Sequence, residues 1–401
     1  MNRLASTAMT DTNKKTKKDK LFPFINGRKS LTFATKLKTN LMIDLQHLLN
    51  QNEFSKQDLI YLLTLKGDAV SQLFEKSKEI KQKYVGNSVY LRGLIEFSNI
   101  CRKNCFYCGI RSGNPSVGRY QVTEDEVVEA AKFASAHKYG SLVLQSGERM
   151  TSEFTDTIAR ILERIHKETH QALGITLSLG EQTEETYRKW FSAGAKRYLL
   201  RIESSNRELF EKIHPNDDKH RYDDRIEALQ LLKKVGYQVG TGIMIGLPFQ
   251  TMDILAEDLL FFKKLDIDMV GMGPYLEHEE TPLINYKDCL LPKEERLELS
   301  LKMLALLRIL MKDINIAATT ALQTLDPNGR KKAVEIAANV VMPNLTPNNY
   351  RENYFLYENK SITMDDALKY HQILEKEIES AGGKIAYDLH GDSLHFTARK
   401  N

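Results

Sequence analysis

The chain has 401 residues, of which 42% are hydrophobic, so it can bury a substantial core in one large domain or two small ones. Its net charge of +4 is spread over 57 basic and 53 acidic residues, which gives no argument for binding to nucleic acid or to a membrane surface. No apolar run approaches the roughly 20 residues of a transmembrane helix. Four cysteines in so long a chain suit a reducing compartment, and a cytoplasmic location is expected.

The first 41 residues differ from the rest of the chain. They are rich in lysine and show little hydrophobic periodicity, so residues 1–41 are predicted to be a disordered basic extension. An over-extended start is the favoured explanation, because Met42 opens the first amphipathic stretch; a transit peptide for an anaerobic organelle is the alternative. Residues 42–86 have a helical pattern, with Ser55 as a predicted N-cap, and are expected to form an N-terminal cover.

After residue 86 the pattern becomes that of buried strands alternating with helices. The predicted strands are Val89–Phe97, Ser141–Gln145, Ile175–Leu179, Arg197–Ile202, Gln238–Ile245, Met269–Met272, Ile314–Ala318 and Val340–Met342. Helices are predicted at Glu124–His137, Thr151–His170, Glu184–Ala193, Asp223–Val235, Met252–Lys264 and Pro292–Met311.

Eight strands at this spacing predict an α/β fold, a TIM-type (β/α)8 barrel over residues 87–346 followed by a C-terminal closing segment at 347–401. A doubly wound parallel sheet is the alternative. The glycine-rich fingerprint of dinucleotide binding is missing after the first strand, which favours the barrel.

Three of the four cysteines lie together directly after the first predicted strand, as Cys101-Arg-Lys-Asn-Cys105-Phe-Tyr-Cys108. Thiolates hold iron–sulfur clusters, and three on one loop can bind three irons of a cubane cluster while the fourth iron stays open for a substrate or cofactor. Zinc is the alternative, but this spacing offers no second pair of ligands. The fourth cysteine, Cys289, stands alone and is interpreted as a structural thiol.

The cysteine spacing, with the aromatic Tyr107 before the last cysteine, resembles the CxxxCxxC motif of the radical S-adenosylmethionine (SAM) enzymes. The resemblance implies one 4Fe–4S cluster ligated by Cys101, Cys105 and Cys108, with the amino and carboxylate groups of SAM on the open iron. It also implies an enzyme that cleaves SAM reductively to methionine and a 5′-deoxyadenosyl radical. The cofactors supply this chemistry, and the protein orients and shields them.

Polar and small residues follow the second and third strands, at the end of a barrel where active sites gather. The segment from Gln145 to Glu148 lies where radical SAM enzymes carry a GGE-like segment that receives the SAM amino group, and Gly147 permits close backbone approach. Thr176 and Ser178 point to the same face of the third strand. These residues are therefore candidates for binding a cofactor or a substrate.

Arg201 and Glu203 share one face at the end of the fourth strand. They either pair with each other or bind a zwitterionic ligand, because buried polar groups need partners. Gly246 ends the fifth strand, where glycine permits approach to adenine or simply a tight strand end. Thr319 and Thr320 follow the seventh strand and offer hydroxyls suited to a small polar group.

A closer resemblance, over residues 42 to about 357, is to the FeFe-hydrogenase maturases of the HydE family. It is carried by the segments Ile95–Arg111, Leu142–Glu148, Thr176–Glu181, Arg197–Arg201, Asp268–Gly271 and Met342–Asn344. The cofactor-binding residues expected from motif and resemblance together are Tyr107, Gln145, Gly147, Glu148, Ser178, Glu203, Arg225 and Gly246. The expected substrate-binding residues are Thr176, Arg201, Thr319, Thr320, Tyr354 and Tyr357.

This resemblance implies assembly of the hydrogenase di-iron subcluster, with an iron–cysteine carbonyl and cyanide precursor as substrate. HydG, HydF and an electron donor are the implied partners. Ile202 stands where the family commonly has a histidine, and no cysteine follows Tyr357, so no second cluster is expected. The alternatives are a radical SAM enzyme like methylornithine synthase or biotin synthase acting on a small amino acid, and a SAM-free carrier of a cluster.

Overall fold

The computed structural model describes residues 44–357 and 367–400. The chain divides into two compact units, residues 1–48 and 49–401, and the predicted extension at 1–41 lies outside the described residues. Helix α2 (Leu45–Leu49) runs from the first unit into the second. Among the helices of the described ranges, none has the length and apolar character needed to cross a membrane.

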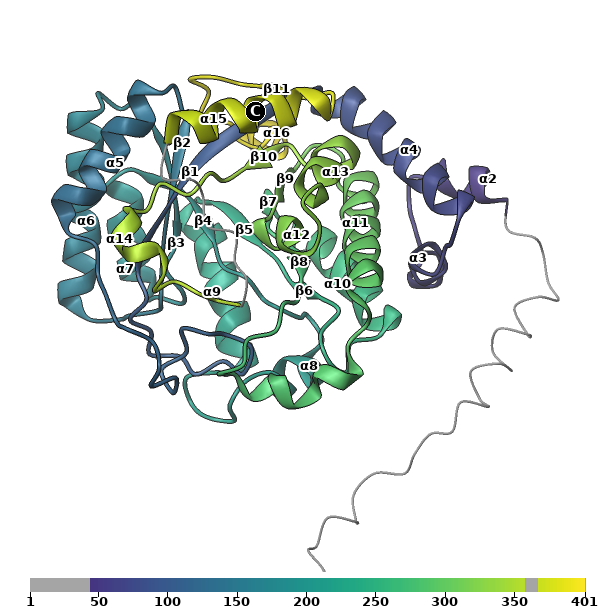
Figure 1. The fold of residues 1–401 in the computed structure, drawn as a ribbon, viewed down its shortest axis with the longest axis horizontal. Coiled ribbons are helices and arrows are strands. Elements are labelled where there is room, and N and C mark those ends of the chain that lie inside the picture. Colours follow the sequence, from purple (N-terminus) through teal and green to yellow (C-terminus); the bar gives the residue numbers. More distant parts are fainter. Residues whose placement is uncertain (1–43, 358–366, 401) are drawn as a thin grey trace, which may run out of the picture. The chain divides into compact units, whose positions relative to one another are not determined.

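Eight parallel strands close into a barrel in the second unit (Figure 1). Their order is β10–β9–β7–β5–β4–β3–β2–β1, and β10 pairs with β1 to close the ring. The strands are β1 (Ser88–Ser98), β2 (Ser141–Ser146), β3 (Gly174–Ser178), β4 (Ala195–Leu199), β5 (Gln238–Thr241), β7 (Met269–Val270), β9 (Asn315–Ala318) and β10 (Val340–Val341). The predicted TIM-type barrel is thereby confirmed.

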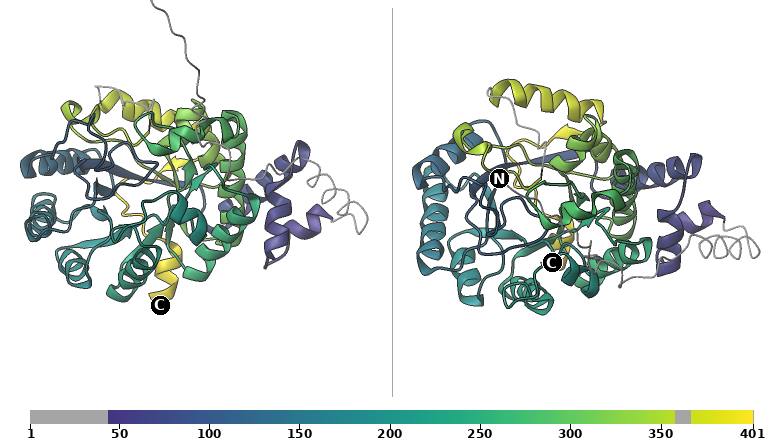
Figure 2. Two further views of the ribbon diagram at one scale, coloured as in Figure 1. Left: turned by 90° about the horizontal axis from the view of Figure 1, so that it is seen from below. Right: turned by 60° about the horizontal axis from the view of Figure 1, so that its bottom comes forward.

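Helices surround the strands on the outside of the barrel (Figure 2). They are α5 (Glu124–Ala136), α6 (Ser152–Glu168), α7 (Glu184–Ser192), α8 (Arg207–Lys212), α9 (Tyr222–Val235), α10 (Met252–Leu265), α11 (Lys293–Leu310), α12 (Thr320–Leu325) and α13 (Gly329–Ile336). A threonine begins four of them, α5, α6, α7 and α10, and its hydroxyl accepts the backbone N–H three residues on. Local sequence therefore defines where these helices begin.

The first helices of the second unit lie against the outside of the barrel. Helix α3 (Lys56–Leu63) begins at the predicted N-cap Ser55, whose side chain forms a capping box with Asp58. Helix α4 (Asp68–Tyr84) packs on α11 and α13, and the hydroxyl of Ser77 donates to the carbonyl of Ile336 at 2.9 Å. The N-terminal cover is thus a layer on the side of the barrel.

Two predicted strands are interrupted near their C-terminal ends. The fifth splits at Gly242 into β5 and β6 (Met244–Ile245). The sixth, predicted to reach Met272, ends at Val270 as β7, and β8 (Gly273–Pro274) follows it; β6 and β8 pair separately. The cause is close backbone approach, because a Cβ at residue 242 would lie 2.0 Å from the carbonyl oxygen of Gly271. The fourth strand likewise ends at Leu199 rather than at residue 202. The C-terminal ends are therefore loops, which can carry a site.

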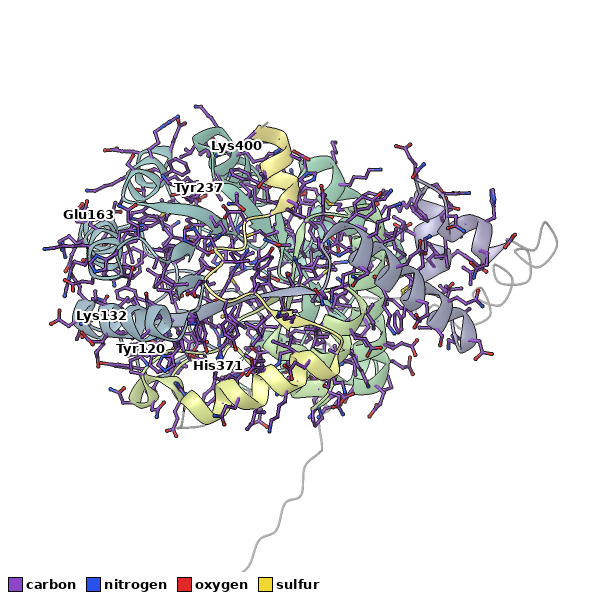
Figure 3. The ribbon with its side chains drawn as sticks, turned by 90° about the horizontal axis from the view of Figure 1, so that it is seen from above. Tyr120, Lys132, Glu163, Tyr237, His371 and Lys400 are labelled. Carbon is purple, nitrogen blue, oxygen red and sulfur yellow. The ribbon has the colours of Figure 1, made fainter. Side chains whose placement is uncertain are left out.

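After the barrel come α14 (Asn348–Arg351), α15 (Ala367–Ser380), β11 (Lys384–Ile385) and α16 (Leu394–Lys400). The segment before α16 crosses the N-terminal ends of the strands: Arg92 and Asn315 both donate to the carbonyl of Gly391, at 3.0 and 2.9 Å. Figure 3 shows the labelled His371 of α15 and Lys400 of α16 on opposite sides of this crossing. The C-terminal segment therefore closes the end of the barrel opposite the cysteine loop.

Helix α16 is fixed to the barrel by ion pairs. His395 lies between Asp313 and Asp266, with its ring nitrogens 3.0 and 2.7 Å from their carboxylate oxygens, and Arg399 contacts Asp268 at 2.7 Å. Hydrogen bonding to Asp313, opposed by burial and aided by Asp266, raises the pKa of His395 to about 9. The docking of α16 is therefore linked to pH.

We expect His395 to stabilise the fold below about pH 6.5 and to lose this effect as the pH rises through about 9, because its pKa is raised in the folded state. The unfolding temperature of His395→Gln should be about 1–3 °C below wild type at pH 7. The difference should vanish near pH 10. Thermal unfolding followed by circular dichroism measures it. The control is His371→Gln. Burial lowers the pKa of His371, so the difference in unfolding temperature between this variant and wild type should stay the same from pH 7 to pH 10.

Candidate active site

The cysteine loop, residues 99–119, connects β1 to the segment before α5 without regular structure and is held by side-chain hydrogen bonds to backbone atoms. Asn99 donates to the carbonyl of Gly118 at 2.8 Å and accepts the N–H of Tyr120 at 2.8 Å. The guanidinium of Arg119 donates to the carbonyls of Asn99 and Ile110, each at 2.7 Å. These contacts give an irregular loop a fixed shape.

The three cysteines of this loop are half-buried or buried. Burial raises the pKa of all three thiols, that of Cys105 to about 12, so a positive charge must accompany the thiolate form that binds metal. The backbone N–H of Glu148 donates to the sulfur of Cys101 at 3.3 Å, and the backbone at Ile110 hydrogen-bonds to Cys108. Sulfur ligands on one loop with N–H donors around them fit an iron–sulfur cluster.

Two aromatic residues between the cysteines anchor the loop. Phe106 and Tyr107 pack on a buried group that we call the Leu209 cluster, made of Leu209, Ile213, Leu247, Tyr275 and Leu283. The hydroxyl of Tyr107 donates to Nε2 of His214 at 3.1 Å, while Nδ1 of His214 faces a carbonyl. Burial, followed by the nearby Arg225, lowers the pKa of His214 to about 3, so the imidazole is neutral and can accept.

Gly147, which follows β2, lies directly against the cysteine loop. A Cβ there would be 2.5 Å from the carbonyl oxygen of Ile100 and 2.7 Å from Cβ of Cys101. Beside it, the N–H of Arg102 donates to the carbonyl of Glu148 at 2.9 Å. The glycine predicted to admit a cofactor is therefore also required for contact between the first two loops.

Four buried charged residues meet behind the cysteine loop, and we call them the four-charge cluster: Lys103, Glu148, Glu181 and Arg225. Nζ of Lys103 lies 2.7 Å from Glu181 and 3.6 Å from Glu148. Nε of Arg225 lies 2.5 Å from the other oxygen of Glu181. Burial would raise the pKa of Glu181, but Arg225 and Lys103 outweigh it and lower this pKa to about 2.

Glu148 is placed differently within the same cluster. Its Oε2 accepts the backbone N–H of Glu181 at 2.8 Å, and its Oε1 lies 3.0 Å from Nε of the half-exposed Arg102. Burial outweighs the attraction of Lys103 and raises the pKa of Glu148. The two carboxylates thus differ in proton affinity, and Glu181 is the one that holds the two buried cations.

Arg201 and Glu203 form a bidentate pair just past the end of β4. The two N···O distances are 2.8 and 2.9 Å, and Arg201 also donates to the carbonyls of Gly271 and Ile243. Glu203 has a φ of 64°, a left-handed conformation that is costly for a side chain of this size. The mutual pairing considered from the sequence is the arrangement seen here, and both groups face the end of the barrel at which the cysteines lie.

The remaining residues expected to contact ligands differ in their surroundings. Gln145 donates to the hydroxyl of the buried Tyr354 at 3.2 Å. Burial raises the pKa of Tyr357, whose hydroxyl interacts with Thr324. The hydroxyl of Thr319 has no hydrogen-bond partner among the described residues. Ser178 is half-buried at the end of β3 beside Gln145, and Thr320 is half-buried at the start of α12.

Two expected site residues are occupied by other contacts. The hydroxyl of Thr176 accepts from Nε of Arg197 at 3.0 Å, and Arg197 also contacts Asp392 of the C-terminal segment at 2.7 Å. Thr176 therefore belongs to the layer next to the closed end of the barrel. Gly246 has a φ of 81° and lies against the side chain of Arg296, so the turn itself requires a glycine.

Lys103, Glu181 and His214 belong to the site although sequence reasoning assigned them no role. Lys103 lies inside the cysteine motif, and Glu181 lies in one of the segments that carry the family resemblance. His214 follows the short helix α8 and is recognised only by its contact with Tyr107. The place of Glu181 after the third strand was the available signal for that residue, whereas Lys103 looks in the sequence like a solvated residue.

The chain was compared with known proteins. Residues 95–262 match the model of the Radical SAM superfamily. The FeFe hydrogenase maturase subunit HydE of Thermotoga maritima is 43% identical over 344 residues, which are 86% of this chain and 95% of that protein. The 3-methylornithine synthase of Methanosarcina acetivorans is 28% identical over 72% of this chain and 79% of its own.

Among solved structures, methylornithine synthase (PylB) aligns with a TM-score of 0.74 at 24% identity, covering 86% of this chain and 97% of its own. This similarity shows the same fold. With the cysteine loop at one end of a closed parallel barrel, the chain is a radical SAM enzyme. At 43% identity over most of its length, it belongs to the HydE family of FeFe hydrogenase maturase subunits. Its cofactors are a 4Fe–4S cluster and SAM, and Cys101, Cys105 and Cys108 have the spacing of the superfamily motif.

We expect Gly147→Ala to displace the cysteine loop, because the added Cβ would lie 2.5 Å from a backbone oxygen that cannot move independently. Iron bound after anaerobic reconstitution should fall at least severalfold, measured by iron content and by absorbance of the cluster. The matched control is Gly271→Ala, whose Cβ would meet only the Leu199 methyls at 3.7 Å or more, and which should retain its iron. Normal iron in both variants would contradict the packing argument.

Proposed function

We propose that this protein is a hydrogenase maturase that acts on an iron–cysteine carbonyl and cyanide precursor during assembly of the FeFe-hydrogenase di-iron subcluster. The observation that carries the proposal is the 43% identity to a HydE protein over 86% of the chain. The geometry supports it, because one buried and two half-buried thiols and charged groups of both signs gather at the C-terminal ends of the strands, where barrel enzymes have their active sites.

The thiols of Cys101, Cys105 and Cys108 would hold the 4Fe–4S cluster. Bound there with SAM, the cluster supplies the electron and the open iron needed for reductive cleavage to a 5′-deoxyadenosyl radical. The protein contributes burial, which keeps water from the sulfurs, and N–H donors such as that of Glu148, which favour the thiolates. The packing of Phe106 and Tyr107 on the Leu209 cluster holds the loop in place.

Glu203 and Arg225 are the residues we assign to binding the zwitterionic end of SAM, a carboxylate for its ammonium group and a guanidinium for its carboxylate. Arg201, the hydroxyl of Thr319, which has no partner within the described part of the chain, and the two tyrosines Tyr354 and Tyr357 would line the substrate space. Arg201 donates hydrogen bonds to two backbone carbonyls, and these bonds hold its guanidinium in a fixed orientation toward that space.

By the same family relationship, HydG, HydF and an electron donor are the proposed partners, and the cytoplasm is the proposed location. The electron donor must reach the cysteine loop, whose Cys101 and Cys108 are only half-buried.

We expect each of Cys101→Ser, Cys105→Ser and Cys108→Ser to lose most of the bound iron and all cleavage of SAM to 5′-deoxyadenosine, because each removes one of three ligands. Anaerobic assays with dithionite measure the product by chromatography. The control is Cys289→Ser: its exposed thiol lies on the 3-10 helix Pro282–Cys289, so iron and cleavage should match wild type. Loss of the cluster in this control would contradict the three-ligand assignment.

Maturation itself is tested by co-expressing the chain with an FeFe hydrogenase in a host that lacks its own HydE. We expect hydrogen evolution to be restored by wild type and not by Cys105→Ser. Cleavage of SAM without restored hydrogenase, accompanied by turnover of L-lysine, would instead favour the reaction of the methylornithine synthases, which share the fold.

A further inference from the structure

The four-charge cluster holds two cations and two carboxylates, all at least nine-tenths buried, and the half-exposed Arg102 lies at its edge, 3.0 Å from Glu148. Its members come from four places in the fold: the cysteine loop, the loops after β2 and β3, and helix α9. A buried charge without a partner is strongly unfavourable. Removing one member of the cluster should therefore change the ion pairs that the other three form. Lys103 is the only one of the four supplied by the cysteine loop itself.

The arrangement leaves part of Arg225 available. Its Nε donates to Glu181 and its Nη1 donates to the carbonyl of Arg201, whereas Nη2 makes no hydrogen bond with the described residues. Glu181 can be satisfied with this single contact because its second oxygen is bound by Lys103 at 2.7 Å. If Lys103 were absent, that oxygen would be free to compete for the remaining nitrogen of Arg225.

Lys103 is also fixed by its surroundings. Nζ donates to the backbone carbonyl of Lys219, and the next residue, Asn104, has its N–H bound by Nε2 of His220 at 2.8 Å. His220 is in turn held by Asp217 at 2.6 Å. The lysine therefore cannot swing to solvent, and its charge stays beside Glu181.

We propose that Lys103 is a positioning residue for SAM: it neutralises Glu181 so that Arg225 keeps a guanidinium nitrogen for the SAM carboxylate. The inference rests on the assignment of Arg225 to SAM under the proposed function. Nζ of Lys103 contacts Glu181, Glu148 and the carbonyl of Lys219, all within the protein. Through Glu181, Lys103 links the cysteine loop to Arg225, the arginine assigned to the SAM carboxylate. The cluster site and the SAM site therefore share one set of buried charges.

The test is equilibrium binding of SAM to the reconstituted protein, with iron content and thermal unfolding measured on the same samples. Lys103→Met removes the charge and keeps the chain length. We expect it to retain iron but to bind SAM about tenfold or more weakly. Lys103→Arg should bind within about threefold of wild type, because the charge is retained.

The decisive variant is the double change Lys103→Met with Glu181→Gln, which removes one cation and one anion together. Charge balance predicts that it binds SAM more tightly than Lys103→Met alone, by about threefold or more. A Lys103→Met protein that binds SAM like wild type would overturn the proposal. The proposal would also be overturned if the double variant bound SAM no more tightly than Lys103→Met alone. It would be overturned as well if Lys103→Met lost iron and the added Glu181→Gln change did not restore it. In either case the lysine would serve only to pack the loop.

Arg225→Met separates this inference from the assignment on which it rests. It should weaken SAM binding at least as much as Lys103→Met does. If Arg225→Met binds SAM normally, the assignment of Arg225 to SAM is wrong, whatever the lysine variants show. If it binds weakly while Lys103→Met binds normally, the assignment holds and only the role of Lys103 falls.

Discussion

The contact between Lys103 and Glu181 joins residues that are 78 positions apart in the chain, and the active-site end of the molecule depends on it. The contact forms because β1, β2 and β3 are neighbours in the parallel sheet, which brings the loops after β1 and β3 together at one end of the barrel. Both side chains are buried, so each charge is stabilised by having the other as its partner. The pairing of these charges therefore depends on the packing of the strands that precede them.

The two ends of the barrel have different roles: contacts at the N-terminal ends of the strands stabilise the fold, and the loops at the C-terminal ends carry the candidate active site. At the N-terminal end, the interior is filled by polar contacts with the C-terminal segment, in which Gly391 and Asp392 accept hydrogen bonds from Arg92, Asn315 and Gln238. At the other end the polar groups meet in loops, and among the described residues the hydroxyl of Thr319 and Nη2 of Arg225 have no hydrogen-bond partner. Closing one end leaves the other free to bind ligands.

The fold could be predicted from sequence because its signals are local. Eight apolar runs at regular spacing predicted all eight strands, and Ser55 with Asp58 three residues on predicted a helix start that the structure confirms. The early ends of the fifth and sixth strands could not be predicted. They result from contact between the backbones at Gly242 and Gly271, which no local pattern encodes.

The site could likewise be predicted only where its signals are local. The cysteine motif is local, and its resemblance to a family gave the cofactors. A lysine between two cysteines, by contrast, has the sequence appearance of a solvated residue, and only the fold brings Lys103 to Glu181. Thr176 illustrates the converse. Its place on one face of a strand with Ser178 suggested a ligand contact, but the next strand presents Arg197, which binds its hydroxyl.

Arg201 and Glu203 form an ion pair whose two members are held differently by the rest of the protein. The guanidinium of Arg201 is held by two backbone carbonyls as well as by Glu203, so it would stay in place without the carboxylate. The carboxylate of Glu203 is held by Arg201 alone among the described residues, on a backbone with a φ of 64°. In the proposed arrangement Glu203 takes the ammonium group of SAM and Arg201 pairs with an anionic group of the substrate, so neither charge is left unpaired.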